Sequence, residues 1–231
     1  MNILYLHFLT TFPSVVILIY FFSSDKFQEP KKLIFYTFIV GMIMTFFVGL
    51  FKYFLYTFIP KQGPFFTAFF DAALIEELGK FLVLYLFCAR FTQFNEPMDG
   101  IVYGTVVSLS FATYENYEYV FNNTDYNISY AIAFMRAITA IPMHAFCGVL
   151  MGFFIGKYFF RKNNKKIYLR LALIIPILFH GFYNYFLMEQ DFNDKLSLLV
   201  LLILTFFTIY FHNHMKNLQN FKNQEKEIKK Y

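Results

Sequence analysis

Residues 65–89 read FFTAFFDAALIEELGKFLVLYLFCA, a long apolar stretch with charged residues near its centre. Three of these charges, Glu76, Glu77 and Lys80, lie within five residues of one another. A charged side chain at the centre of a bilayer costs about 2.5–3.5 kcal/mol even on the lenient insertion scale. The stretch therefore predicts a membrane-spanning helix whose carboxylates take part in chemistry, in ion pairing, or in both.

The composition of the whole chain is that of a membrane protein. Of its 231 residues, 58% are hydrophobic and 15% are charged, whereas a soluble protein carries about 25% charged residues. The net charge of +5 is not a nucleic-acid signature, because the basic residues lie in short loops and in the C-terminal tail. We therefore expect a protein in contact with a lipid bilayer and no nucleic-acid partner.

Seven segments are long and apolar enough to cross a bilayer, which requires about 20 mostly apolar residues. They are residues 3–22, 33–59, 65–89, 98–121, 130–160, 167–188 and 196–210. The predicted fold is all-α, a polytopic membrane protein with about seven transmembrane helices. We expect one integral-membrane domain over residues 1–215, with its polar motifs in residues 65–188, and a polar basic cytoplasmic tail over residues 216–231.

The loops between these segments carry their basic residues mainly on one side. Most Lys and Arg residues lie in the first, third and fifth loops and in the tail, whereas Lys61 and Lys195 lie on the opposite side. Basic loops tend to remain in the cytoplasm. This pattern predicts an N-terminus outside the cell and a C-terminus in the cytoplasm.

Polar side chains recur within four of the predicted spans. Outside residues 65–89 they are Glu115, Arg136, His144, His180 and Asn184. At about 1.5 Å per helical residue, the acids and histidines of this set fall in the middle or outer part of the bilayer. We therefore expect them to line one water-filled cavity that opens to the extracytoplasmic side.

Helical periodicity indicates how some of these groups are arranged. At about 100° per residue, Lys80 lies angularly between Glu76 and Glu77 and one turn further along the helix. It can therefore pair with either carboxylate and hold it ionised. His180 and Asn184 are four residues apart, which places both side chains on one helix face.

Three further ionisable residues of the spans, Lys52, Asp71 and Asp99, are interpreted as helix caps or interfacial charges. Asp99 begins the motif DGIVYG, whose glycines Gly100 and Gly104 predict the close approach of a second helix.

The polar set fits hydrolysis by two alternative mechanisms. A glutamate can act as a general base toward water, while imidazole and Asn groups stabilise an oxyanion. Alternatively, Glu76, His144 and His180 can hold one Zn²⁺ ion that activates a bound water. Both mechanisms stay open. The candidate catalytic residues are Glu76, Glu77, Glu115, His144, His180 and Asn184, with Lys80 and Arg136 as supporting charges.

Five motifs on successive helices resemble those of a known family. They are EELGK (76–80), DGIVYG (99–104), FATYEN (111–116), the segment around His144, and HGFYN (180–184). In this order they resemble the PrsW family of bacterial intramembrane proteases, within the superfamily of CAAX-prenyl and bacteriocin-processing proteases. The prenyl-protease branch has His where this chain has Glu115, and commonly Arg where it has Lys80, so the resemblance is to the PrsW branch.

The resemblance implies a site-1-type endopeptidase in the cytoplasmic membrane of a bacterium. Its implied substrate is a single-pass membrane protein, an anti-sigma factor, cut near the extracytoplasmic face. The family pattern carries over onto Glu76, Glu77, Lys80, Glu115, His144 and His180, and Asn184 matches the HxxxN element of the superfamily.

Two other functions are compatible with the polar residues. A proton- or ion-coupled transporter also places carboxylates and histidines within the membrane, although the sequence has no internal repeat and no paired broken helices. A non-catalytic protein that binds membrane helices is the second alternative.

Overall fold

The computed structural model describes residues 3–59, 62–189 and 195–228, with side chains up to residue 221. Within these ranges every regular element is a helix, which confirms the predicted all-α fold. Lys61, which contributes to the predicted orientation, lies outside the described residues, as do residues 229–231 of the predicted tail.

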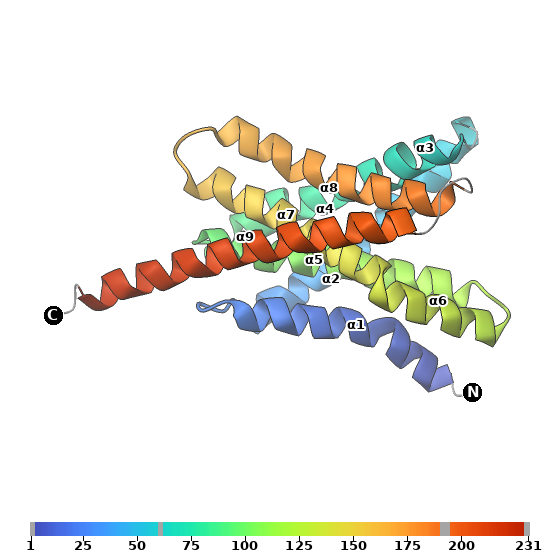
Figure 1. Ribbon diagram of the computed structural model, residues 1–231, viewed down its shortest axis with the longest axis horizontal. Helices are drawn as coiled ribbons and strands as arrows, with labels where there is room; N and C mark the ends of the chain where they lie inside the picture. The colour runs from blue at the N-terminus through green and yellow to red at the C-terminus, as the bar shows by residue number, and fades with distance from the viewer. Residues whose placement is uncertain (1–2, 60–61, 190–194, 229–231) are drawn as a thin grey trace.

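Five helical segments are long and apolar enough to cross a membrane, with one consecutive pair of helices counted once. They are α1 (Ile3–Ser24), α2 (Lys31–Phe58), the pair α6 (Tyr126–Ile138) and α7 (Ala140–Phe160), α8 (Lys165–Met188) and α9 (Lys195–Ile228). They form an elongated bundle (Figure 1). This arrangement supports a multi-pass membrane protein.

The other two predicted spans are helical but are not among these five. Residues 64–90 pass through α3 (Pro64–Phe66), the π-helical η1 (Thr67–Leu74), α4 (Ile75–Leu82), the π-helical η2 (Val83–Phe87) and the 3₁₀ turn η3 (Cys88–Arg90). α5 (Pro97–Phe121) follows them. Both stretches carry ionisable side chains that lipid-facing helices avoid, and both place such side chains inside the bundle.

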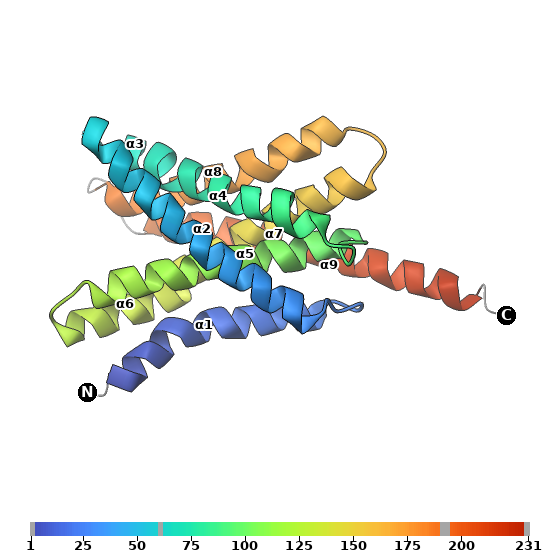
Figure 2. The same cartoon turned by 180° about the vertical axis from the view of Figure 1, so that it is seen from behind.

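α5 is the central helix of the bundle and packs against α1, α2 and α7. Figure 2 shows α2 crossing one side of it, and most of its residues are buried. Glu96 is the N-cap of α5, and Asp99, interpreted from the sequence as a cap, closes a capping box with it from the third helical position. The polar groups along α5 therefore meet protein rather than lipid.

Glycines allow α5 and α7 to approach closely. A Cβ atom on Gly104 would lie 2.5 Å from the carbonyl oxygen of Gly148, and one on Gly100 would meet the backbone of α7. Residues without a side chain let two helix backbones come into contact. The predicted close approach is thus confirmed, and it aligns the two helices so that Glu115 lies beside His144.

The predicted span over residues 130–160 is divided at Thr139. Its backbone leaves the helical conformation (φ −125°, ψ −72°) between α6 and α7. Pro142 lies in the first turn of α7, where its missing N–H removes no helical hydrogen bond. The break places Arg136, in the last turn of α6, next to the first turns of α7.

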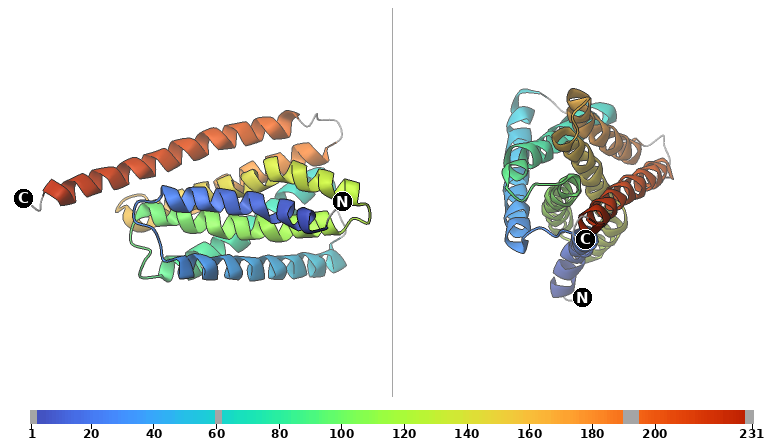
Figure 3. Two further views of the ribbon diagram at one scale, coloured as in Figure 1. Left: turned by 90° about the horizontal axis from the view of Figure 1, so that it is seen from below. Right: turned by 90° about the vertical axis from the view of Figure 1, so that its left-hand side faces the viewer.

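α9 continues past the predicted last span, residues 196–210, to Ile228. Gln219 fixes this extension to the rest of the bundle, because its Nε2 donates to Asp25 Oδ1 (2.7 Å) and to Glu96. Its Oε1 accepts from the backbone N–H of Lys26 (3.3 Å). Residues 216–228 of the predicted tail therefore continue a helix, which runs beyond the neighbouring helices (Figure 3).

Candidate active site

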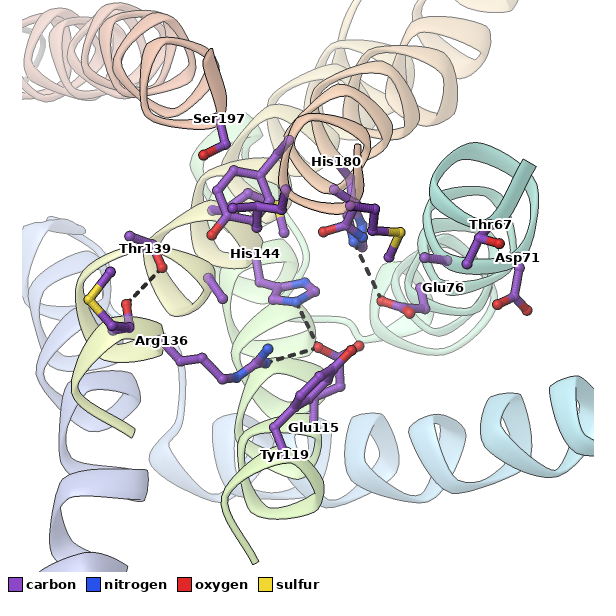
Figure 4. A pocket seen from close by; sticks show the side chains of 18 of the residues that line it. Thr67, Asp71, Glu76, Glu115, Tyr119, Arg136, Thr139, His144, His180 and Ser197 are labelled. Atoms are coloured by element: carbon purple, nitrogen blue, oxygen red, sulfur yellow. Dashed lines mark hydrogen bonds and ion pairs between the residues drawn. The ribbon is translucent and has the colours of Figure 1, made fainter. Parts of the chain in front are cut away.

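A cavity of about 530 Å³ lies among the helices that carry the polar motifs. Its wall includes six of the predicted site residues, Glu76, Glu115, Arg136, His144, His180 and Asn184. Glu77 and Lys80 lie behind this wall and are fully buried. Figure 4 shows Glu76, Glu115, His144 and His180, from four different helices, turned toward one another.

Two glycines let the helices around the cavity come together. A Cβ atom on Gly79 would lie 2.8 Å from Val48 Cγ2, so this glycine lets α4 pack against α2. A Cβ atom on Gly181 would overlap the ring of Phe69, so this glycine lets α8 pack against η1. The contact brings His180 next to the carboxylates in the first turn of α4.

Glu77 and Lys80 orient His180 from inside the protein. Oε1 of Glu77 lies 2.6 Å from Lys80 Nζ and 2.8 Å from His180 Nδ1. Because a carboxylate accepts, Nδ1 carries a proton, and in the neutral imidazole this leaves the lone pair on Nε2. Nε2 faces Glu76, with 3.8 Å to its Oε2. A carboxylate that holds the far nitrogen of a histidine is typical of metal sites.

His144 is held at both ring nitrogens. Nδ1 lies 2.9 Å from Lys80 Nζ, and Nε2 lies 3.0 Å from Glu115 Oε2. An ammonium group only donates, so Nδ1 accepts and Nε2 donates to the carboxylate in this arrangement. The rings of His144 and His180 are 5.0 Å apart between centroids. Lys80 thus contacts one histidine directly and the other through Glu77.

Arg136 fixes the position of Glu115. Its Nη2 lies 3.1 Å from Glu115 Oε2, its Nε donates to Asn116 Oδ1 (2.9 Å), and its guanidinium lies 4.3 Å from the ring centre of Tyr119. Asn116 in turn donates to the carbonyl of Thr10 on α1 (2.7 Å). The carboxylate of Glu115 is therefore anchored at the edge of the cavity.

Lys52 and Asp71, interpreted from the sequence as caps or interfacial charges, line the same cavity. Lys52 Nζ lies 2.7 Å from Glu76 Oε1, and Tyr56 donates a short hydrogen bond to Asp71 Oδ2. The sequence does contain a feature that points to Lys52 as a site residue. Lys52 is the sole charged residue of α2 after Lys32. An intramembrane charge is a functional candidate by default.

Glu76, His144 and His180 have the geometry of a metal-binding triad. Each offers one donor atom, and these atoms lie within 4.8 Å of one another. Oε2 of Glu76 is buried and makes no hydrogen bond within the described part of the chain, a state that a buried carboxylate oxygen rarely keeps. Two imidazoles and a carboxylate form a common ligand set for zinc, so these residues fit one divalent metal ion, provided that the coordinating nitrogen of His144 gives up its contact with Lys80 or Glu115.

Comparison with known proteins gives one family. The family described as "PrsW family intramembrane metalloprotease" matches residues 29–211. No solved structure matches the chain.

The similar curated proteins all carry the name "Protease PrsW". The protein of Geobacillus kaustophilus is 36% identical over 180 residues, which cover 78% of each chain. That of Bacillus subtilis is 34% identical over 177 residues, with 76% of this chain and 79% of the relative covered. That of Clostridioides difficile is 29% identical, with 96% and 94% covered. With its cavity of facing acids and histidines among membrane-spanning helices, this chain belongs to the PrsW family of intramembrane metalloproteases.

Proposed function

We propose that this protein hydrolyses a peptide bond of a single-pass membrane protein, at a cavity inside its own helix bundle. The observation that carries the proposal is the convergence of Glu76, Glu115, His144 and His180 on that cavity. Two acids and two imidazoles supply the acid, base and ligand functions that peptide hydrolysis requires. The family resemblance favours an anti-sigma factor as the substrate.

Glu76, His144 and His180 would hold one zinc ion. When bound, a zinc ion supplies a Lewis acid for the scissile carbonyl and an activated water. Glu77 and Lys80 act as positioning residues, because they hold the imidazole of His180 with Nε2 toward the cavity. Lys80 also lies 2.9 Å from His144 Nδ1, which places its ammonium group beside the ligand set.

Glu115 is the proposed general base. Glu115 lines the same cavity as the triad, and its Oε2 lies 3.0 Å from His144 Nε2. This position supports a role toward a water bound beside the triad. Glu115 takes a proton from the attacking water and returns it to the amine nitrogen as the C–N bond breaks. Arg136 keeps this carboxylate in place. Asn184 lines the same wall and donates to the carbonyl oxygen, on which negative charge develops.

In the proposed topology all seven predicted segments cross the membrane, the N-terminus lies outside and the C-terminus in the cytoplasm. The basic loops support this orientation. The cavity is lined by residues near the predicted outer helix ends, such as Thr67, Glu118, Met188 and Ser197. Cleavage near the extracytoplasmic face follows from that position. The bacterial relatives support the cytoplasmic membrane of a bacterium as the location.

The test compares cells that express the wild type with cells that express Glu76→Gln. Mass spectrometry of the membranes and the medium identifies single-pass proteins that lose their extracytoplasmic domains. Selective loss in wild-type cells is the expected result and names the substrate. Identical profiles from two well-folded proteins would overturn the proposal. Substrate-dependent proton flux in liposomes would then favour a transporter.

A further inference from the structure

Lys52 reaches the candidate triad from α2, a helix that supplies none of its ligands. Nζ of Lys52 lies 2.7 Å from Glu76 Oε1, and its side chain is 20% exposed in the cavity wall. The rest of α2 after Lys32 is uncharged. Because a charged side chain within a membrane-spanning helix is costly, a cation at this position requires a compensating role.

The contact makes the two oxygens of Glu76 unlike. Oε1 accepts a hydrogen bond from Lys52. Oε2 is buried, makes no hydrogen bond among the described residues, and lies 3.8 Å from His180 Nε2. The last torsion of a glutamate side chain is soft and roughly two-fold. The ion pair therefore determines which oxygen faces the histidine.

α2 makes a second polar contact with the same stretch of helix, one turn further along. Tyr56 lies four residues after Lys52 and donates to Asp71, five residues before Glu76. This contact also joins α2 to the stretch that carries Glu76, but it does not touch the triad. Tyr56 is therefore a matched control. Its removal tests what happens when a polar contact that only joins the two helices is lost.

We propose that Lys52 is a positioning residue for Glu76, which holds Oε1 so that Oε2 alone is presented to the metal. The inference rests on the proposed function, in which Glu76 is a ligand. It adds a residue of α2 to the site and assigns a different task to each oxygen of one carboxylate.

The first measurement is spectroscopic and does not depend on turnover. Purified wild type, Lys52→Met, Lys52→Arg and Tyr56→Phe are loaded with Co²⁺ as a probe for the zinc site, and their visible spectra are compared. Removal of the ammonium group frees Oε1, so that both oxygens of Glu76 can bind. A higher coordination number weakens the visible absorption of Co²⁺. We expect a weaker, shifted band for Lys52→Met alone.

The second measurement separates kcat from KM on the substrate found by the proteomic comparison. Loss of an outer partner of a metal ligand typically lowers activity about 10–100-fold. We expect a fall of this size in kcat for Lys52→Met, with KM little changed and most of the rate recovered in Lys52→Arg. Tyr56→Phe should keep the wild-type kcat. Thermal unfolding in detergent shows which variants are folded.

The proposal would be overturned if Lys52→Met and Tyr56→Phe gave the same Co²⁺ spectrum and the same kcat. Lys52 would then only hold α2 against the neighbouring helix. An unchanged Co²⁺ spectrum in Lys52→Met would overturn it as well. If Lys52→Met does not fold, Lys52→Gln, whose shorter and uncharged side chain also removes the ammonium group, replaces it in both measurements, with the same supporting and overturning results. Failure of the proposed function can be distinguished from failure of the Lys52 proposal. In that case the wild type itself would neither bind Co²⁺ nor cleave a membrane protein.

Discussion

The carboxylate of Glu77 lies 2.8 Å from Nδ1 of His180, and both side chains are buried from solvent. The same oxygen accepts from Lys80 at 2.6 Å. Glu77 therefore orients an imidazole and also balances the charge of an ammonium group that has no access to water.

Replacement of Glu77 by Gln is expected to destabilise the protein strongly. The amide keeps the shape of the side chain but leaves Lys80 without its counter-charge, and loss of one partner of a buried ion pair costs about 3–5 kcal/mol. Denaturant unfolding in detergent micelles measures this loss. Glu118→Gln is the control, because Glu118 makes no ion pair within the described residues. Equal stabilities of the two variants would contradict the buried pair.

Metal removal should abolish cleavage. A zinc chelator is expected to stop turnover, and added Zn²⁺ should restore it, since the ion supplies the Lewis acid. His144→Ala and His180→Ala should each lower the bound zinc, measured by elemental analysis, whereas Asn184→Ala should retain it. Full activity in zinc-free protein would instead favour the mechanism in which a glutamate alone activates water.

Glu115→Gln should lose the rate but keep the metal. The amide can still accept from His144 and Arg136, but it cannot take a proton from water. Removal of a general base lowers kcat by about 10²–10⁴-fold. Single-turnover cleavage together with zinc content checks both parts. A variant that loses its zinc would place Glu115 among the ligands rather than at the base position.

The contact between α5 and α7 predicts a steric effect at Gly104. A methyl group there would lie 2.5 Å from the carbonyl oxygen of Gly148, so Gly104→Ala must push two backbones apart. Overpacking of this kind costs about 1–3 kcal/mol. At Gly49 no atom lies within 4 Å of the added Cβ, so Gly49→Ala should be neutral or stabilising. Thermal unfolding of both variants, in the same detergent, tests the difference.

Glu29 gives a prediction about pH outside the membrane-spanning segments. It lies between α1 and α2, and burial raises the pKa of its carboxyl above the usual range, while a hydrogen bond from Tyr103 (2.7 Å) opposes that rise. The folded state therefore favours the protonated carboxyl. This contribution to stability is complete below the usual pKa of Glu and is lost as pH rises through the raised value.

The variant Glu29→Gln removes this titration and keeps an acceptor for Tyr103. Its stability relative to the wild type should therefore increase as pH rises from about 4 to about 7, across and above the ordinary pKa of Glu. Melting temperatures across this range provide the measurement. Parallel curves for the two proteins would show that Glu29 ionises as readily in the folded as in the unfolded chain.

Hydropathy predicts where most helices lie, because lipid-facing helices must be apolar along their length. The break at Thr139 is a different case. The residues on both sides of it are apolar, and Pro142 is tolerated within the first turn of a helix. The extension of α9 past Tyr210 depends on a tertiary contact of Gln219, which hydropathy does not register.

Most members of the site could be predicted one by one, since each charge inside a span requires a partner or a task; Lys52 and Asp71, interpreted as caps or interfacial charges, are the exceptions. The sequence does not predict which of these charged side chains pair with one another. Helical spacing lets Lys80 reach either Glu76 or Glu77. The choice depends on α2, whose Lys52 occupies Glu76 and leaves Glu77 to Lys80. Contacts between segments that are distant in the sequence decide such a choice.

The central position of Lys80 has a consequence for affinity. This one side chain touches His144 and, through Glu77, also restrains His180, so contacts within the protein already group the donor atoms of two helices. A preorganised receptor gives up little conformational entropy when its ligand arrives. If the triad holds a metal ion, Lys80, which is not itself a ligand, would thereby influence how tightly the ion binds.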